Sequence, residues 1–152
     1  MRSMSIEEKI NQRQFKSSYH KLALNLIYTT GSLQAFLKAG FKKEDLTLQQ
    51  YNILRILRGN LPKPLSTLQI RARMMDKMSD TSRIVDRLVS KSLVTKSINT
   101  IDNRLVDVVI TPEGLKKLAL LDKTEDRIAE FFSAVSTEEA ENISFLLDKL
   151  HG

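Results

Sequence analysis

The sequence predicts a mainly α-helical fold with one small β-wing, and three patterns in its 152 residues support this. Apolar residues recur at steps of three and four over most of the chain, which is typical of amphipathic helices. Three segments carry the Ser/Thr-x-x-Glu/Gln capping box that opens a helix, at Thr47, Ser66 and Ser136. At residues 105–110, Val106, Val108 and Ile110 alternate with Leu105, Asp107 and Val109, which is the period of two that is typical of strands.

Residues 5–39 are expected to form one long helix that ends at Gly40. Its apolar stripe is too long to be buried by a small domain, so it requires other helices, from this chain or from a second copy. Three aromatic residues on it are candidates for a pocket that binds a small aromatic ligand: Tyr19, Tyr28 and Phe36. The alternative is that these aromatics are core residues, which is the more frequent role of aromatics at helical spacing.

Two shorter helices are expected next. The capping box at Thr47 opens the first, and Gly59 and Asn60 stop it. Pro62 and Pro64 then hold the chain extended, where it can add a short third strand to the ribbon. The capping box at Ser66 opens the second helix, which runs to Met74.

The segment 78–92, MSDTSRIVDRLVSKS, is expected to be the helix around which the chain is organised. Ile84, Val85 and Leu88 form its apolar face, and Ser79 or Asp80 is the expected N-cap. Small hydroxyls and two arginines are expected on the opposite face: Ser79, Thr81, Ser82, Arg83 and Arg87. Arginine suits phosphates and guanine edges, so this face favours contact with nucleic acid. The alternative for Arg83 is a surface ion pair with Asp80 or Asp86.

Residues 93–99 and 105–110 are expected to form two strands around a polar tip at residues 100–104. The Asp102 carboxylate lies two residues before Arg104 and can accept a charge-assisted hydrogen bond from it, which would shape the tip. Helix, turn, helix and ribbon in this order is the winged helix-turn-helix plan. In that plan the second helix enters the major groove, and the wing reaches the backbone or the minor groove.

Two further helical segments complete the chain. Thr111 and Pro112 suit the cap and first position of a helix whose apolar stripe runs to Val135. Ser136 opens the last helix, which carries Ile143, Leu146 and Leu150. Together with the N-terminal helix, these apolar stripes predict a homodimer.

Composition and charge exclude several classes of function. The net charge is +6, and the basic excess lies in residues 1–111, whereas residues 112–152 carry nine acidic and five basic side chains. The chain has no cysteine, so disulfides and thiol switches are excluded. No metal site, cofactor site or catalytic constellation can be assembled, because His20 and His151 lie at opposite ends. We therefore expect no enzyme. With no run of 18 apolar residues and no apolar signal core, we expect no membrane span and a cytoplasmic location.

Residues 46–114 resemble the MarR family of winged-helix transcriptional regulators. The matching stretches are LTLQQYNILRIL (46–57), STLQIRARM (66–74), SRIVDRLVSKSLVTK (82–96) and DNRLVDVVITPEG (102–114). The resemblance implies a single domain over 1–152, with a winged helix-turn-helix at about 46–114 and dimerisation helices at about 5–40 and 112–150. It also implies a homodimeric repressor that binds a pseudo-palindromic double-stranded operator and responds to a small aromatic effector. The DNA-binding residues it implies are Ser66, Ser79, Thr81, Ser82, Arg83, Arg87, Asn103 and Arg104.

Three positions depart from the family pattern. Ser92 stands where the family usually has Gly, and Lys96 and Asn103 stand where it often has Arg. A left-handed Ser92 would cost about 1 kcal/mol relative to Gly. With fewer guanidinium groups, the wing is expected to hold DNA less tightly. The alternative reading is therefore a winged-helix module that binds protein rather than DNA.

Overall fold

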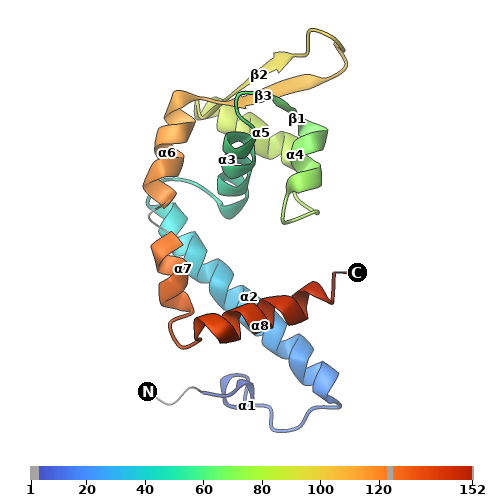
Figure 1. Ribbon diagram of the computed structural model, residues 1–152, viewed down its shortest axis with the longest axis vertical. Helices are drawn as coiled ribbons and strands as arrows, with labels where there is room; N and C mark the ends of the chain where they lie inside the picture. Colours follow the sequence, from blue (N-terminus) through green and yellow to red (C-terminus); the bar gives the residue numbers. More distant parts are fainter. Residues whose placement is uncertain (1–3, 123–124, 152) are drawn as a thin grey trace. The chain divides into compact units, whose positions relative to one another are not determined.

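The computed structural model describes residues 4–122 and 125–151, and the chain divides into two compact units, residues 1–39 and residues 40–152. The helices and strands follow each other along the chain as α1 (Ile6–Lys9), α2 (Ser18–Lys42), α3 (Leu48–Asn60), β1 (Leu65–Ser66), α4 (Thr67–Arg73), α5 (Thr81–Ser90), β2 (Val94–Ile98), β3 (Val106–Ile110), α6 (Pro112–Asp122), α7 (Glu125–Phe131) and α8 (Thr137–Asp148) (Figure 1). None of the helices in the described ranges is long and apolar enough to cross a membrane.

In the first unit, the prediction of a single helix over residues 5–39 is wrong. Asn11 has a left-handed backbone with φ 51°, which interrupts the helical hydrogen bonds, and the long helix α2 begins only at Ser18. The short helix α1 is held to α2 by an ion pair between Glu7 and Lys21, with Nζ and Oε1 2.5 Å apart. Asn11 is one of the few residue types that tolerate this conformation, so the break is encoded locally.

The helix α2 also continues past its expected end. It runs through Gly40 to Lys42, where Gly40 and Phe41 are buried. The Phe41 ring stacks on Tyr51 of α3, with 4.6 Å between the ring centroids. Burial of this ring favours continuation of the helix, and the chain turns only at Asp45, where φ is 52°.

The second unit contains the expected winged helix-turn-helix. Its sheet has the order β1-β3-β2, and both pairings are antiparallel. The third strand, β1, was expected as an extended segment and pairs Leu65 with Val108. Helices α3, α4, α5 and α6 bury one shared core against this sheet, and its fully buried members include Ile53, Leu54, Ile70, Met74, Val85, Leu88, Val108, Leu118 and Leu121. The β2–β3 hairpin extends past α4 and α5 as a wing (Figure 1).

The end of α5 confirms the left-handed conformation expected at Ser92, where φ is 58°. The Leu93 amide donates to the Leu88 carbonyl at 3.0 Å, and the Ser92 amide donates to Val89 at 2.8 Å. These two bonds form a Schellman motif, in which Gly is the usual residue at the position of Ser92. Leu88 and Leu93 are both buried, so the motif also fixes how the chain enters β2.

Close approach of α6 to the chain before β2 requires glycine at position 114. A Cβ added there would lie 2.2 Å from the Leu93 carbonyl oxygen. The Thr111 hydroxyl accepts a hydrogen bond from the Gly114 amide at 3.0 Å, which confirms Thr111 as the cap and Pro112 as the first helical residue.

The C-terminal segment differs from expectation in one respect. Residues 112–135, expected as one helix, form α6 and α7, and residues 123–124 between them lie outside the described ranges. The capping box of α8 is confirmed, because the Ser136 hydroxyl accepts from the Glu139 amide and the Glu139 carboxylate accepts from the Ser136 amide. No residue of α8 is buried, and Ile143, Phe145 and Leu146 are all exposed.

Candidate nucleic-acid interface

The helix α5 is positioned by the turn that precedes it. Asp80 is the N-cap, as expected, and its Oδ1 accepts a hydrogen bond from the Arg83 amide at 3.2 Å. Within the turn, the Asp76 carboxylate accepts from the Met78 amide at 3.0 Å, and Lys77 Nζ donates to the Ala72 carbonyl at 2.6 Å. These local bonds fix the direction in which α5 leaves α4.

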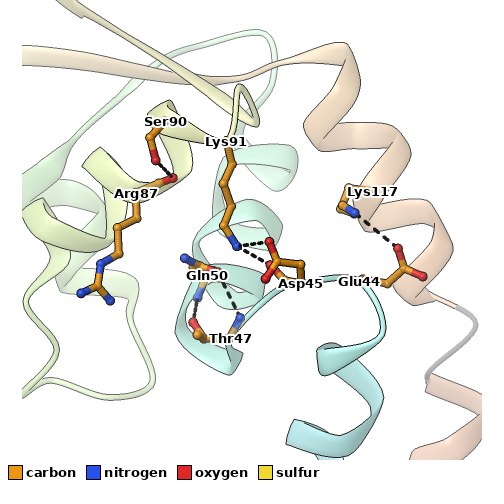
Figure 2. Close-up of polar contacts among 8 residues, drawn as sticks. All are labelled: Glu44, Asp45, Thr47, Gln50, Arg87, Ser90, Lys91 and Lys117. Atoms are coloured by element: carbon orange, nitrogen blue, oxygen red, sulfur yellow. Dashed lines mark hydrogen bonds and ion pairs between the residues drawn. The ribbon is translucent and has the colours of Figure 1, made fainter.

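The two arginines of α5 are presented to solvent. The Arg83 side chain is 73% exposed, and its Nε lies 3.9 Å from Asp80, which is a long ion pair without a hydrogen bond. Arg87 is also exposed, and Figure 2 shows its side chain extending away from Ser90 and Lys91. Its guanidinium makes no hydrogen bond or ion pair with any residue that the structure describes. Both guanidinium groups are therefore available to a ligand.

The hydroxyl side chains that were expected on the same exposed face of α5 differ in how far they are buried. Thr81 is buried, with only 5% of its surface exposed, so its expected place on the exposed face is wrong. Thr81, Val85 and Leu88 follow one another at the i, i+4, i+7 spacing and share one stripe of the helix. Ser79 is half-buried, whereas Ser82 is exposed. Ser66 is half-buried and caps α4 by accepting from the Gln69 amide at 3.2 Å.

The side chain of Asp86 connects α5 to the wing. The sequence offered Asp86 as an alternative ion-pair partner of Arg83, but its Oδ1 lies 2.8 Å from Nζ of Lys96 on β2. Side chains of a strand alternate between its two faces, so Lys96 shares a face with the buried Val94. The inner face of the wing is therefore turned toward α5.

The expected pairing at the wing tip is confirmed. Asp102 Oδ1 accepts from both Nε and the amide of Arg104 at 3.1 Å, and Oδ2 accepts from Nη2 at 3.4 Å. Hydrogen bonds from the Arg104 side chain and amide hold the pKa of the Asp102 carboxyl below its usual value. The Arg104 side chain is 87% exposed, so its charge faces solvent despite this pair. Asn103 beside it is exposed.

Two ion pairs that the sequence analysis missed hold the loop between α2 and α3 (Figure 2). Lys91, at the end of α5, lies 3.0 Å from the Asp45 carboxylate and also donates to the Asp45 carbonyl oxygen. Lys117 of α6 lies 3.5 Å from Glu44. The partners are 46 and 73 residues apart in the chain, so no local pattern indicates them.

Residues 46–106, which hold α3, α4, α5 and most of the wing, match the family model described as MarR family. The match covers less than half of the chain, and it assigns the segment that holds the winged helix-turn-helix to the MarR family. The three-stranded sheet with its covering helices matches the MarR winged-helix fold.

One curated relative of this chain is the HTH-type transcriptional repressor MdtR of Bacillus subtilis (strain 168). The two are 28% identical over 119 residues, which are 78% of this chain and 76% of the relative. Two solved structures extend the comparison. A MarR transcription factor from Planctomyces limnophilus is 29% identical with a TM-score of 0.68, over 89% of this chain and 98% of that one.

The second structure is a mutant MarR from E. coli complexed with operator DNA, 20% identical with a TM-score of 0.80. The match covers 91% of this chain and 99% of that one, and it shows a shared fold.

The three aromatic residues considered for ligand binding all lie on α2. Tyr19 is 84% exposed, Tyr28 is 40% exposed, and Phe36 is half-buried. Their role as ligand contacts stays a prediction. Within residues 4–122 and 125–151, no three histidine, aspartate or glutamate side chains are arranged to hold a metal ion.

Proposed function

We propose that this protein binds double-stranded DNA sequence-specifically and represses transcription as a homodimer. The observation that carries the proposal is the exposed face of α5, where Ser82, Arg83 and Arg87 are open to solvent beside a wing tip that presents Arg104. An exposed helix with two arginines one turn apart fits the major groove, where guanine offers two acceptors to each guanidinium.

The proposed contacts with DNA are of three kinds. Arg83 and Arg87 are proposed to read base edges, and Ser82 to contact a base or a phosphate. Ser66, half-buried at the start of α4, is proposed to contact a phosphate. The hydroxyl oxygen of Ser79 is buried and has no hydrogen-bond partner within the described residues, so the phosphate contact proposed for Ser79 requires its side chain to rotate outward. Asn103 and Arg104 are proposed to reach the minor groove or the backbone. Thr81 supports the base-reading helix through packing, because its side chain is buried.

The homodimer is supported by exposed apolar side chains on the terminal helices. Ile27 of α2 is 69% exposed, and Phe145 and Leu150 at the C-terminus are 59% and 62% exposed. Apolar surface of this kind is stabilised by burial against a second copy. We propose that the single domain over residues 1–152 dimerises through helices within 5–40 and 112–150. Two copies would place two α5 helices on a pseudo-palindromic operator.

We further propose that a small aromatic molecule weakens operator binding. The aromatic residues of α2 support this, as does a fold relative, Bordetella bronchiseptica BpsR, whose DNA binding is regulated by 6-hydroxynicotinic acid. Because the chain has no cysteine, the response would be non-covalent. We also propose that the protein acts in the cytoplasm, and that its function involves no cofactor and no catalytic activity.

The test is a selection of DNA fragments by the purified protein. Genomic fragments are incubated with the protein at physiological salt, and the bound DNA is sequenced. Recovery of a shared sequence with two-fold symmetry supports the proposal. Recovery of random DNA, or of none, supports the alternative of a protein-binding winged-helix module, which the exposed Asp80 and Asp86 on α5 would favour.

A further inference from the structure

The tip of the wing is a rigid loop built around Asn99. The side-chain nitrogen Nδ2 of Asn99 donates to both carboxylate oxygens of Asp107, at 2.9 and 3.0 Å. Its side-chain oxygen accepts from the amides of Ile101 and Asp102, both at 2.9 Å. The Asp102 carbonyl accepts from the Leu105 amide at 2.9 Å. These bonds hold the tip in one conformation, so a partner would meet it already ordered.

The rigid tip carries a large apolar side chain into water. Ile101 is 95% exposed, and Ile98 just before it is 68% exposed. Tight turns usually hold glycine, asparagine, aspartate or proline, each for a backbone reason that isoleucine lacks. A lone exposed apolar residue is common on protein surfaces. Here, two such residues lie three positions apart on a preorganised loop, which is the arrangement of a contact surface.

The strand alternation indicates where this apolar surface faces. Val94, Lys96 and Ile98 alternate along β2 and share the inner face of the wing, on which Lys96 contacts Asp86 of α5. Ile98 therefore continues the face that is turned toward α5, beyond the end of the core. A ligand bound along the exposed side of α5 would extend toward Ile98 and Ile101.

The charges of the tip point to a shallow contact with DNA rather than to a phosphate clamp. Residues 99–107 carry Asp102, Asp107 and Arg104, a net charge of −1. Two of the three guanidinium nitrogens of Arg104 are bonded to Asp102, and Nη1 makes no hydrogen bond within the described residues. Both N–H donors of Nη1 and one of Nη2 therefore remain beside an apolar side chain, a combination that suits the deoxyribose walls and acceptor floor of a minor groove about 6 Å wide.

We infer that Ile101, supported by Ile98, is an apolar wedge that the wing inserts against the sugars of the DNA minor groove. The inference rests on the proposed function. It adds to that function an uncharged wing residue that contributes to the affinity for DNA. In this arrangement Arg104 supplies one hydrogen bond to the groove floor, and the apolar side chain excludes water around it. Sequence preference at the wing would then follow groove width and deformability.

The first experiment compares Ile101→Ser and Ile101→Leu with the wild type on the selected operator over a salt series. Ile101→Ser should bind about tenfold more weakly per wing, on the order of 100-fold for two wings, because the apolar contact is lost. The dependence of affinity on salt should not change, since no phosphate contact is removed. Ile101→Leu should bind like the wild type. The melting temperature of both variants should match the wild type, because the side chain is exposed.

Wild-type affinity in Ile101→Ser, or a loss accompanied by a lower salt slope, would overturn the wedge and leave the proposed function intact. Failure of the wild type to select any DNA would overturn both. If the partner is a protein and not DNA, the wild type will select no DNA, and both the wedge and the proposed function are then wrong.

The second experiment locates the tip on DNA. Because the chain has no cysteine, Ile101→Cys can carry an iron–EDTA cleavage reagent at one position. Thr95→Cys, an exposed residue on the outer face of β2, is the matched control. Cleavage by the Ile101 conjugate should be displaced toward the 3′ end on the two strands, which is the pattern of a reagent in the minor groove. The Thr95 conjugate should cleave weakly. A displacement toward the 5′ end, or no cleavage by the Ile101 conjugate, would refute the placement.

Discussion

Replacement of Arg83 by alanine should reduce specific DNA binding without destabilising the protein. The only ion pair that its guanidinium makes within the described residues is to Asp80 at 3.9 Å, and the side chain is 73% exposed. An exposed pair of this length contributes less than about 0.5 kcal/mol. Asp80 retains its capping bond, because the donor there is the Arg83 backbone amide. The unfolding midpoint of Arg83→Ala should therefore match that of the wild type.

The effect on DNA binding should be much larger. A bidentate contact between arginine and guanine contributes about 1–3 kcal/mol of discrimination, and a homodimer makes two such contacts. The specific complex should therefore lose about 2–6 kcal/mol, a factor of at least about 30 in affinity. Binding to random duplexes should fall far less. Arg55→Ala, which removes the same charge from an exposed position on α3, is the control.

Arg104→Ala should give the opposite pattern. Contact at the wing lies with the backbone or the minor groove, so affinity for specific and random duplexes should fall by similar factors. Because each subunit loses one positive charge at the DNA, the salt slope of the dimer should fall by up to about two. Both variants are measured on both duplexes over a salt series. If Arg83→Ala leaves the ratio of specific to random affinity unchanged, α5 is not the reading helix and the assignment of the interface is wrong.

Four further predictions concern assembly, regulation and stability. Deletion of Ser136–Gly152 should yield monomer or aggregate in light scattering, since it removes apolar surface assigned to the dimer; a well-behaved dimer would refute that interface. Titration with phenolic acids such as salicylate should weaken operator binding and raise the melting temperature, and no change across a broad aromatic panel would leave the α2 aromatics as packing residues. Ser92→Gly should raise the free energy of unfolding by about 0.5–1 kcal/mol in urea denaturation, because its φ of 58° suits glycine; a decrease would contradict the assigned strain. Gly114→Ala should lower it by about 1–3 kcal/mol, because the added Cβ would meet the Leu93 carbonyl oxygen at 2.2 Å; an unchanged midpoint would refute that close approach.

Features that depend on neighbours within a few residues were predictable from the sequence. The capping boxes at Thr47, Ser66 and Ser136 formed as expected, because each joins residues three positions apart. The Asp80 cap and the pairing of Asp102 with Arg104 follow the same rule. The left-handed Ser92 was predictable from its place at a helix end. In each case, local geometry restricts the partner to one or two positions.

Two corrections concern patterns that were present in the sequence. Thr81 lies at i−4 from Val85, and this spacing indicates its burial more strongly than its hydroxyl indicates exposure. Asn11 tolerates the left-handed conformation, but asparagine adopts it only where the surrounding chain favours a break. In this protein the ion pair between Glu7 and Lys21 stabilises the arrangement that follows the break.

The tertiary structure alone decided the contacts between distant segments. Asp86 meets Lys96 because the wing folds back over α5, and Lys91 meets Asp45 because α5 ends beside the loop that enters α3. Arg58 of α3 binds Asp122 of α6 through two hydrogen bonds, at 2.5 and 3.0 Å, across 64 residues of chain. Charged side chains have many possible partners in the sequence, and helical and strand periodicity do not rank them. The choice among them is made by the packing of the apolar core, which brings α3, α5, α6 and the wing together and leaves each surface charge with the partner that lies within reach.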